Sequence, residues 1–249
     1  MRNVILSFDD GLYDFKTNAL PLFDKYGFKA SINVITKYSE DGYFDEYRYL
    51  SIEDLKELKK HGFELACHTN SHQRNIEIED LKVSLDKMRK YFGSDKYGCI
   101  LPYSQPVDSD KKDFINSHFL YLADHTFKRR KNNIYYYLCF LIGKIFKIKK
   151  ALFYYCNYSY FYNKQSGFYC FKRLPIKNNF TYKTYIRFLK HMPNNTSITL
   201  MFHSIIKAGE ACPWPDGSWE CDNLDMLLRF LSKHKKQFNV VTQRSLTNG

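Results

Sequence analysis

Short apolar runs alternate with helix-like segments along most of the chain, and this alternation predicts a parallel sheet covered by helices. Strand-like runs are expected at Asn3–Ser7, Lys29–Val34, Phe63–Cys67, Tyr97–Leu101, Phe119–Ala123, Phe168–Leu174, Ser197–Phe202 and Asn239–Val241. Apolar residues at helical spacing predict helices at Asn18–Tyr26, Ile52–His61, Ile78–Tyr91, Asp110–Ser117, Tyr182–His191 and Asn223–Lys235. The number of strand–helix pairs predicts an α/β fold of the (β/α) barrel type. The 249 residues are expected to form a single domain.

Two adjacent carboxylates, Asp9 and Asp10, follow the first apolar run. Side chains alternate between the two faces of a strand, so the two neighbours can serve different partners. Gly11 permits a tight turn that leaves both carboxylates at the end of the strand. An Asp–Gly turn without chemistry is the alternative, and the rest of the chain weighs against it.

A pair of histidines, His68 and His72, follows the strand-like run Phe63–Cys67. Two histidines four residues apart converge on one ion if the chain between them forms a helical turn. Zinc accepts such nitrogens together with a carboxylate oxygen and keeps one position open for water. A chance surface pair is the alternative, but a matching carboxylate pair at another strand end favours a metal site.

Two further strand ends carry candidate chemistry. Leu101-Pro102-Tyr103 follows one strand, and the backbone N–H of Tyr103 is expected to face the pocket, with an ordinary β-turn as the alternative. His203 follows the apolar run Ser197–Phe202, where a histidine that titrates near neutral pH can act as a general acid. Loops after the strands of a (β/α) barrel carry its active site, so these groups are expected to meet.

With the motifs SFDDG, HTNSH and FH in this order, the chain resembles the polysaccharide deacetylase family, the NodB-homology domain of carbohydrate esterase family 4. The similarity is close over Asn3–Tyr103 and looser over Phe168–Val241. The resemblance implies a distorted, incomplete (β/α) barrel. It also implies a hydrolase of carbon–nitrogen bonds other than peptide bonds, which removes N-acetyl groups from amino sugars with one divalent metal ion.

Carried over to this chain, the resemblance implies that Asp9 is the general base. It implies that Asp10, His68 and His72 are the metal ligands. Zinc is the metal expected, with cobalt and nickel as alternatives. The resemblance also implies an N-acetylated glycan as substrate, including intermediates of cell-surface polysaccharide synthesis.

The second half of the implied site departs from the family pattern. Tyr103 corresponds to the aromatic residue whose backbone N–H helps to bind the oxyanion, and His203 to the general acid. Ile100 stands where the family usually has an arginine next to the base, and we expect Arg173 to substitute for it by holding Asp9 ionised. A structural arginine is the alternative. The family's D-x-x-W element has no clear copy, and Asp124 is only a positional substitute for it.

Trp214 and Trp219 follow His203 on a segment that contains proline and glycine. Aromatic faces stack on sugar C–H surfaces, so the two tryptophans are expected to bind substrate. A structural aromatic clasp over the end of the barrel is an equal alternative.

Positive charge is concentrated in one region of this chain, which carries +12 overall. Residues 126–208 contain sixteen Lys and Arg and no Asp or Glu, whereas the rest of the chain is net acidic. A basic, aromatic insertion is expected at about 125–166, and its apolar run is about half of the ~20 residues that a spanning helix needs. An anionic membrane surface is the partner expected, a solvated helical cap is the alternative, and nucleic acid is disfavoured because no known motif accompanies the charge.

Seven cysteines without CxxC spacing indicate reduced thiols, and we expect no secretory leader because the first strand-like run begins at Asn3. The expected location is therefore cytoplasmic, with peripheral attachment to the inner face of the membrane. Two other functions stay open at this point. One is a catalytically inactive relative that binds glycan or membrane, and the other is an amidase of the same superfamily that acts on a small non-sugar amide.

Overall fold

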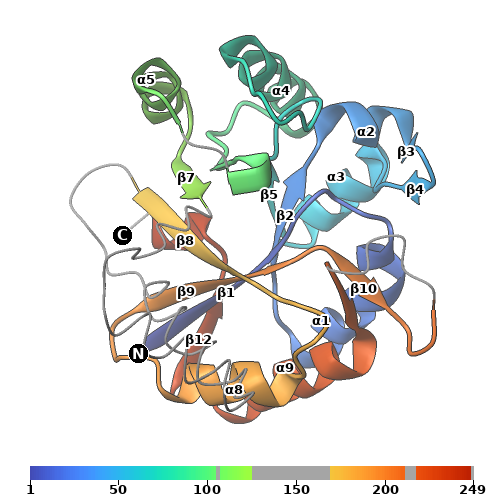
Figure 1. The fold of residues 1–249 in the computed structure, drawn as a ribbon, viewed down its shortest axis with the longest axis vertical. Coiled ribbons are helices and arrows are strands. Elements are labelled where there is room, and N and C mark those ends of the chain that lie inside the picture. The colour runs from blue at the N-terminus through green and yellow to red at the C-terminus, as the bar shows by residue number, and fades with distance from the viewer. Residues whose placement is uncertain (105–106, 125–168, 211–216, 248–249) are drawn as a thin grey trace, which may run out of the picture.

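Parallel strands curl into a closed barrel in the computed structural model, which describes residues 1–104, 107–124, 169–210 and 217–247 (Figure 1). Within these residues, seven strands follow one another around the barrel, and the last pairs with the first to close it. They are β1 (Arg2–Phe8), β2 (Ser31–Val34), β5 (Glu64–Cys67), β6 (Cys99–Ile100), β7 (Tyr121–Asp124), β8 (Tyr169–Pro175) and β9 (Ser197–Phe202). The fold class expected from the sequence is confirmed.

The barrel is distorted around β1, which has three neighbours. Its register with β9 runs from Asn3↔Ser197 to Phe8↔Phe202 on one side. On the other side its first residues pair with β12 (Phe238–Val241) and its last two with β2. An eighth strand is thus inserted beside the start of β1, and β1 and β2 pair only near their ends.

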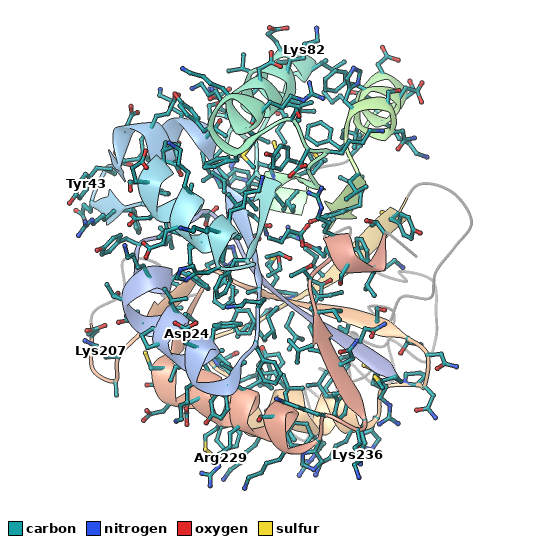
Figure 2. All side chains as sticks on the ribbon, turned by 180° about the vertical axis from the view of Figure 1, so that it is seen from behind. Asp24, Tyr43, Lys82, Lys207, Arg229 and Lys236 are labelled. Atoms are coloured by element: carbon teal, nitrogen blue, oxygen red, sulfur yellow. The ribbon has the colours of Figure 1, made fainter. Side chains whose placement is uncertain are left out.

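Helices cover the outside of the barrel, and Figure 1 shows α4 and α5 at one end of the view and α8 and α9 at the other. They are α1 (Leu20–Tyr26), α3 (Ile52–Lys60), α4 (Ile78–Phe92), α5 (Ser109–His118), α8 (Tyr182–Lys190) and α9 (Cys221–Lys233). The start of α3 illustrates how the sequence fixes a boundary. Ser51 and Asp54 form a reciprocal capping box, in which each side chain accepts from the other's backbone N–H. In Figure 2 the labelled charged side chains Lys82, Arg229 and Lys236 project outward from this layer.

Side chains point alternately to the two faces of each strand, and this divides the apolar side chains into two clusters. Val4, Leu6 and Phe8 of β1 belong to the large cluster that packs beneath the helices, whereas Ile5 belongs to a small cluster inside the barrel. The other buried members of the small cluster are Ala66, Ile100, Tyr121, Ala123 and Phe171. Polar side chains lie before and after this apolar layer along the strands, and those that follow it form the candidate site.

Some elements were not expected from the sequence. After β2 come a short helix α2 (Thr36–Asp41) and a hairpin of β3 (Tyr43–Phe44) and β4 (Tyr47–Arg48). A π-helical turn covers Phe15–Ala19, before α1, and β10 (Ser204–Ile206) pairs with β11 (Ser218–Glu220). These short segments lack the run length from which periodicity can be read.

The expected insertion at 125–166 lies outside the described residues. Among the helices that the structure describes, none has the length and apolar character required to cross a membrane.

Candidate metal and catalytic site

Three side chains that follow the carboxyl ends of β1 and β5, the two strands on either side of β2, converge on one point. Asp10 follows β1, while His68 and His72 follow β5. Asp10 Oδ1 lies 3.3 Å from Nε2 of His68 and 3.2 Å from Nε2 of His72. Their candidate ligand atoms all lie within 4.8 Å of one another. The structure therefore brings together the three residues that the sequence predicted as metal ligands.

These candidate ligands are oriented by residues in the left-handed backbone conformation and not by a helical turn. Asp10 has a φ of 71°, Thr69 of 68° and His72 of 53°. Non-glycine residues rarely adopt this region, which costs on the order of 1–3 kcal/mol each and is found preferentially at functional sites. The histidines converge without the helical turn that the sequence analysis considered. A kinked loop turns His72 back toward His68, aided by a hydrogen bond from the His72 backbone N–H to Thr69 Oγ1 of 3.1 Å.

The donor set fits a divalent metal ion. Asp10 is 1% exposed, and neither of its carboxylate oxygens has a hydrogen-bond partner in the part of the chain that the structure describes. Burial alone would raise the pKa of Asp10, but the two imidazoles more than offset this and hold it well below its usual range. Nδ1 of His68 lies 2.9 Å from the carbonyl oxygen of Ile100, so this nitrogen is the protonated one and Nε2 keeps its lone pair for a metal.

Asp9 lies beside the metal ligands and is ion-paired with Arg173 of β8. Nη1 of Arg173 donates to Oδ1 and Oδ2 of Asp9, at 2.6 and 2.8 Å. Both residues are buried, at 3% and 2% exposed. Burial alone would raise the pKa of Asp9, but Arg173, with smaller contributions from His68 and His203, holds it below the usual value. The structure thus places Arg173 where an arginine next to the base was expected.

Sequence reasoning missed Asn33, which also binds Asp9. Its Nδ2 donates to Asp9 Oδ1 at 2.6 Å and to Ser7 Oγ at 2.8 Å. Asn33 is fully buried in β2. The available signal was an amide between two apolar residues, Ile32 and Val34, of an expected strand, since a buried amide requires polar partners.

His203 lies directly after β9, next to the end of β1. The backbone N–H of Asp9 donates to the carbonyl oxygen of Phe202 at 2.9 Å, so the ends of the two strands are tied together. Gly217 packs against the imidazole, and a Cβ there would lie 3.4 Å from Nδ1 of His203. The positive form of His203 lowers the pKa of both Asp9 and Asp10, which places the imidazole within electrostatic reach of both.

Tyr103 borders the site on the side of His72. It lies in the 3₁₀ turn Pro102–Ser104 with a φ of 56°, and its ring centroid is 4.8 Å from that of His72. The guanidinium of Arg74 lies 4.7 Å from the centroid of the Tyr103 ring. The side chain is 49% exposed, so an aromatic surface is available at the rim. The predicted role of its backbone N–H stays a prediction.

Trp219 does not line the site. It is 2% exposed, and its Nε1–H donates to the carbonyl oxygen of Phe180 at 2.8 Å. Its ring packs 5.6 Å from Tyr185 and 5.7 Å from Phe202, measured between centroids. The expectation that Trp219 binds substrate is wrong, because its face is covered by the core, as in the alternative of a structural clasp. Trp214 lies outside the described residues, as does the side chain of Asp124.

Comparison with known proteins agrees with this geometry. Residues 1–108 match the family model for polysaccharide deacetylases. The resemblance to this family is confirmed. The matched residues include Asp9, Asp10, His68, His72 and Tyr103. YxkH of Bacillus subtilis (strain 168), whose name assigns it to the polysaccharide deacetylases, is 33% identical over 94 residues, covering 34% of this chain and 32% of YxkH. The similarity thus spans about a third of that curated relative.

Solved structures extend the similarity in fold to nearly the whole chain. The Xyl-CE4 domain of a multidomain xylanase from the hindgut metagenome of Trinervitermes trinervoides aligns with a TM-score of 0.54 at 13% identity, covering 99% of this chain and 89% of that domain. The peptidoglycan N-acetylglucosamine deacetylase Bc1960 aligns with a TM-score of 0.55 at 13% identity, covering 96% and 86%. A family 4 acetyl xylan esterase from Clostridium thermocellum, solved with a cobalt ion, aligns at 0.54 and 14%, covering 99% and 90%. At these identities the likeness shows the fold.

Proposed function

We propose that this protein is a metal-dependent N-deacetylase that acts on an amino-sugar-containing glycan. One observation carries the proposal. A metal-type set of Asp10, His68 and His72 lies beside a second buried carboxylate, Asp9, that Arg173 holds ionised. Three ligands leave a position open for water or substrate, and a separate ionised carboxylate is what the activation of that water requires. The match to the polysaccharide deacetylase family and the cobalt-bound structural neighbour support the same chemistry.

The bound divalent ion would polarise the acetyl carbonyl and lower the pKa of the attacking water. Asp9 takes the proton from this water through Oδ2. Its other oxygen, Oδ1, already accepts from both Arg173 and Asn33, whereas among the described residues Oδ2 accepts from Arg173 alone. Oδ2 is also the oxygen that faces the ligands, at 3.9 Å from Nε2 of His68. Arg173 and Asn33 therefore fix which atom of Asp9 acts as the base.

Two further groups complete the reaction. The backbone N–H of Tyr103 donates to the oxyanion that forms at the acetyl group, and loss of such a donor typically costs about 10²–10³ in rate. His203 protonates the sugar nitrogen, because an amide anion cannot leave unprotonated. The exposed ring of Tyr103 offers a stacking face for the sugar at the rim.

The basic region supports a more specific substrate. Residues 126–208 carry sixteen Lys and Arg without an acidic residue. Each basic residue near an anionic bilayer contributes about 1 kcal/mol to binding. As part of the same proposal, this region docks the enzyme on the inner face of the membrane, where a lipid-linked glycan would be its substrate.

Metal content and acetate release test the proposal together. The wild type is expected to hold about one zinc, cobalt or nickel ion per chain, and Asp10→Ala and His72→Ala to hold none. Asp225→Ala is the matched control, because it removes a partly buried carboxylate of α9 that accepts hydrogen bonds from Lys25 and Tyr26 of α1. Acetate release is then measured with N-acetylglucosamine oligomers, free in solution or lipid-linked in anionic vesicles.

Each outcome bears on a defined part of the proposal. Metal in the wild type, its loss in both ligand variants, and acetate release from the oligomers would support the deacetylase. Faster release from vesicles would support membrane docking, and equal rates would overturn it. Metal binding without release from any glycan, but with release from small acetamides, would favour the amidase. Absence of metal in the wild type would overturn the hydrolase and leave a glycan- or membrane-binding protein.

A further inference from the structure

The chain on both sides of His203 is bound by the segment that follows β1, beyond the end of the β1–β9 ladder. The β1–β9 register ends at Phe8↔Phe202, one residue before His203. The chain then leaves the barrel as β10, whose partner is β11. A group that must deliver a proton to one nitrogen atom thus lies at the point where its strand departs from the barrel sheet.

Asp14, which immediately precedes the π-helical turn, and Asn18, which lies within it, bind the segment that follows His203. Ser204 Oγ and Asp14 Oδ2 form a short hydrogen bond. Asn18 Nδ2 donates to the carbonyl oxygen of Ile205 at 2.7 Å. Asp14 and Asn18 are four residues apart, so one turn presents both to the same stretch of chain. π-Helical turns are rare and occur frequently at functional sites.

The same loop also holds the residue before His203. The backbone N–H of Asp9 donates to Phe202. The ten residues from Asp9 to Asn18 therefore bind the chain on both sides of His203, and they also carry the metal ligand Asp10. One loop fixes the general acid relative to the metal.

We propose that Asp14 and Asn18 are positioning residues for His203, which set the distance between its imidazole and the metal site. This inference rests on the proposed function, because it assigns His203 the proton transfer to the leaving amine. The reaction step itself is the one given above: the C–N bond breaks, its electron pair stays on nitrogen, and the imidazolium proton is transferred to that nitrogen.

The chemical cost of Asp14 is consistent with a dedicated role. Burial raises the pKa of Asp14 to about 7, although hydrogen bonds from Ser204 and from the backbone of Ile205 and Phe15 lower it. Burial by itself therefore makes an ionised carboxyl group unfavourable at this position. Its hydrogen bonds to the chain after His203 are what it contributes.

A substrate with a good leaving group distinguishes an effect on the general acid His203 from an effect on the other steps of the reaction. p-Nitrophenolate leaves without protonation, so p-nitrophenyl acetate requires the metal and Asp9 but not His203, whereas an N-acetyl sugar requires all three. The quantity measured is the ratio of kcat on N-acetylglucosamine oligomers to kcat on p-nitrophenyl acetate. His203→Ala gives the lowest value expected for this ratio, since general acid catalysis contributes about 10²–10⁴-fold to the rate.

Asp14→Ala and Asn18→Ala are expected to lower the ratio about tenfold or more, with metal content and ester turnover unchanged, because a small displacement of a catalytic group is costly. Asp14→Asn keeps a neutral acceptor for Ser204, and the ratio should return toward the wild type. Asp225→Ala, which removes a tie between α1 and α9, should leave the ratio unchanged. A ratio unchanged in Asp14→Ala, or lowered equally in Asp14→Asn, would overturn the inference.

Failure of the proposed function gives a different result. If the wild type released acetate from neither compound, the deacetylase would be wrong, and the positioning would be tested by NMR. The imidazole resonances of His203, assigned with His203→Gln, should then shift in Asp14→Ala and not in Asp225→Ala. Unshifted resonances in Asp14→Ala would overturn the positioning as well.

Discussion

Two buried carboxylates on the strands of this barrel, Asp9 and Glu64, have opposite electrostatic surroundings. Asp9 follows the last residue of β1, and Glu64 is the first residue of β5. Both are nearly inaccessible, at 3% and 7% exposed. Asp9 receives two hydrogen bonds from a guanidinium, whereas Glu64 receives hydrogen bonds from neutral donors alone among the described residues.

The neutral donors of Glu64 come from three parts of the chain. Ser31 Oγ donates at 2.6 Å, Tyr121 Oη at 2.7 Å and the backbone N–H of Arg244 at 3.1 Å. Gly98 makes room for this arrangement, because a Cβ there would lie 2.0 Å from the Tyr121 ring. Burial raises the pKa of Glu64, and the hydrogen bonds, together with a smaller contribution from the charge of Arg244, only reduce the shift.

The comparison shows that burial alone does not decide whether a carboxyl group is ionised, because a charged partner can reverse its effect on the pKa. Full burial disfavours the ionised form at both places, and Arg173 reverses the result at Asp9. An ionised carboxylate near a metal can act as a base. Glu64 instead crosslinks Ser31, Tyr121 and the backbone of Arg244, and we expect it to have a structural role where the strands begin.

The largest expected effect comes from the same carboxylate-to-amide change at both places. Asp9→Asn removes the base and should reduce acetate release by about 10²–10⁴-fold, while Glu64→Gln should leave the rate within about twofold. Acetate release at saturating substrate, with metal content as the control, measures this. Comparable losses in the two variants would show that both carboxylates serve catalysis.

The second-largest effect is expected when one hydrogen-bond partner of each carboxylate is removed. Arg173→Gln leaves a buried charge without its counter-ion and should lower the free energy of unfolding by about 3–5 kcal/mol. Tyr121→Phe removes one neutral hydrogen bond and should cost about 1 kcal/mol. Urea unfolding of the metal-free proteins gives both values. Equal costs would mean that Asp9 is not stabilised as an ion.

The smallest effect is a pH dependence. The folded protein binds the Glu64 proton more tightly than the unfolded chain, whose reference pKa is 4.5. The stability that this proton contributes is complete below pH 4.5 and is lost as the pH rises toward the folded pKa. Relative to the wild type, Glu64→Gln should therefore gain up to about 1.4 kcal/mol per pH unit over that window. A difference that does not change with pH, in unfolding measured from pH 4 to 8, would contradict the raised pKa.

The metal half of the site could be predicted from the sequence, because its residues lie in two short motifs at strand ends. Asp10, His68 and His72 all converge, although the loop that joins the histidines is left-handed and not helical. The other half depends on residues far apart in the chain. Arg173 is 164 residues from Asp9, and its contact was only a hypothesis until the strands were in place.

Residues without a motif could not be found in advance. Asn33, Asp14 and Asn18 are ordinary polar residues in the sequence, and only their partners give them a role. Trp219 shows the reverse error, since an aromatic residue near a predicted rim proved to be part of the core. Periodicity reports which face of an element is buried, but not which polar group is opposite a given side chain.

The sequence by itself determined the order of the longer strands and helices, the barrel class and the candidate metal-binding residues, because these depend on local periodicity and on short motifs at strand ends. The tertiary structure decided the ionisation of Asp9 and Glu64, the acceptor oxygen of Asp9 and the position of His203. These depend on distances across the barrel between residues far apart in the chain. Hydrogen bonds and charge interactions act over a few ångströms, and only the closed barrel brings those groups that near.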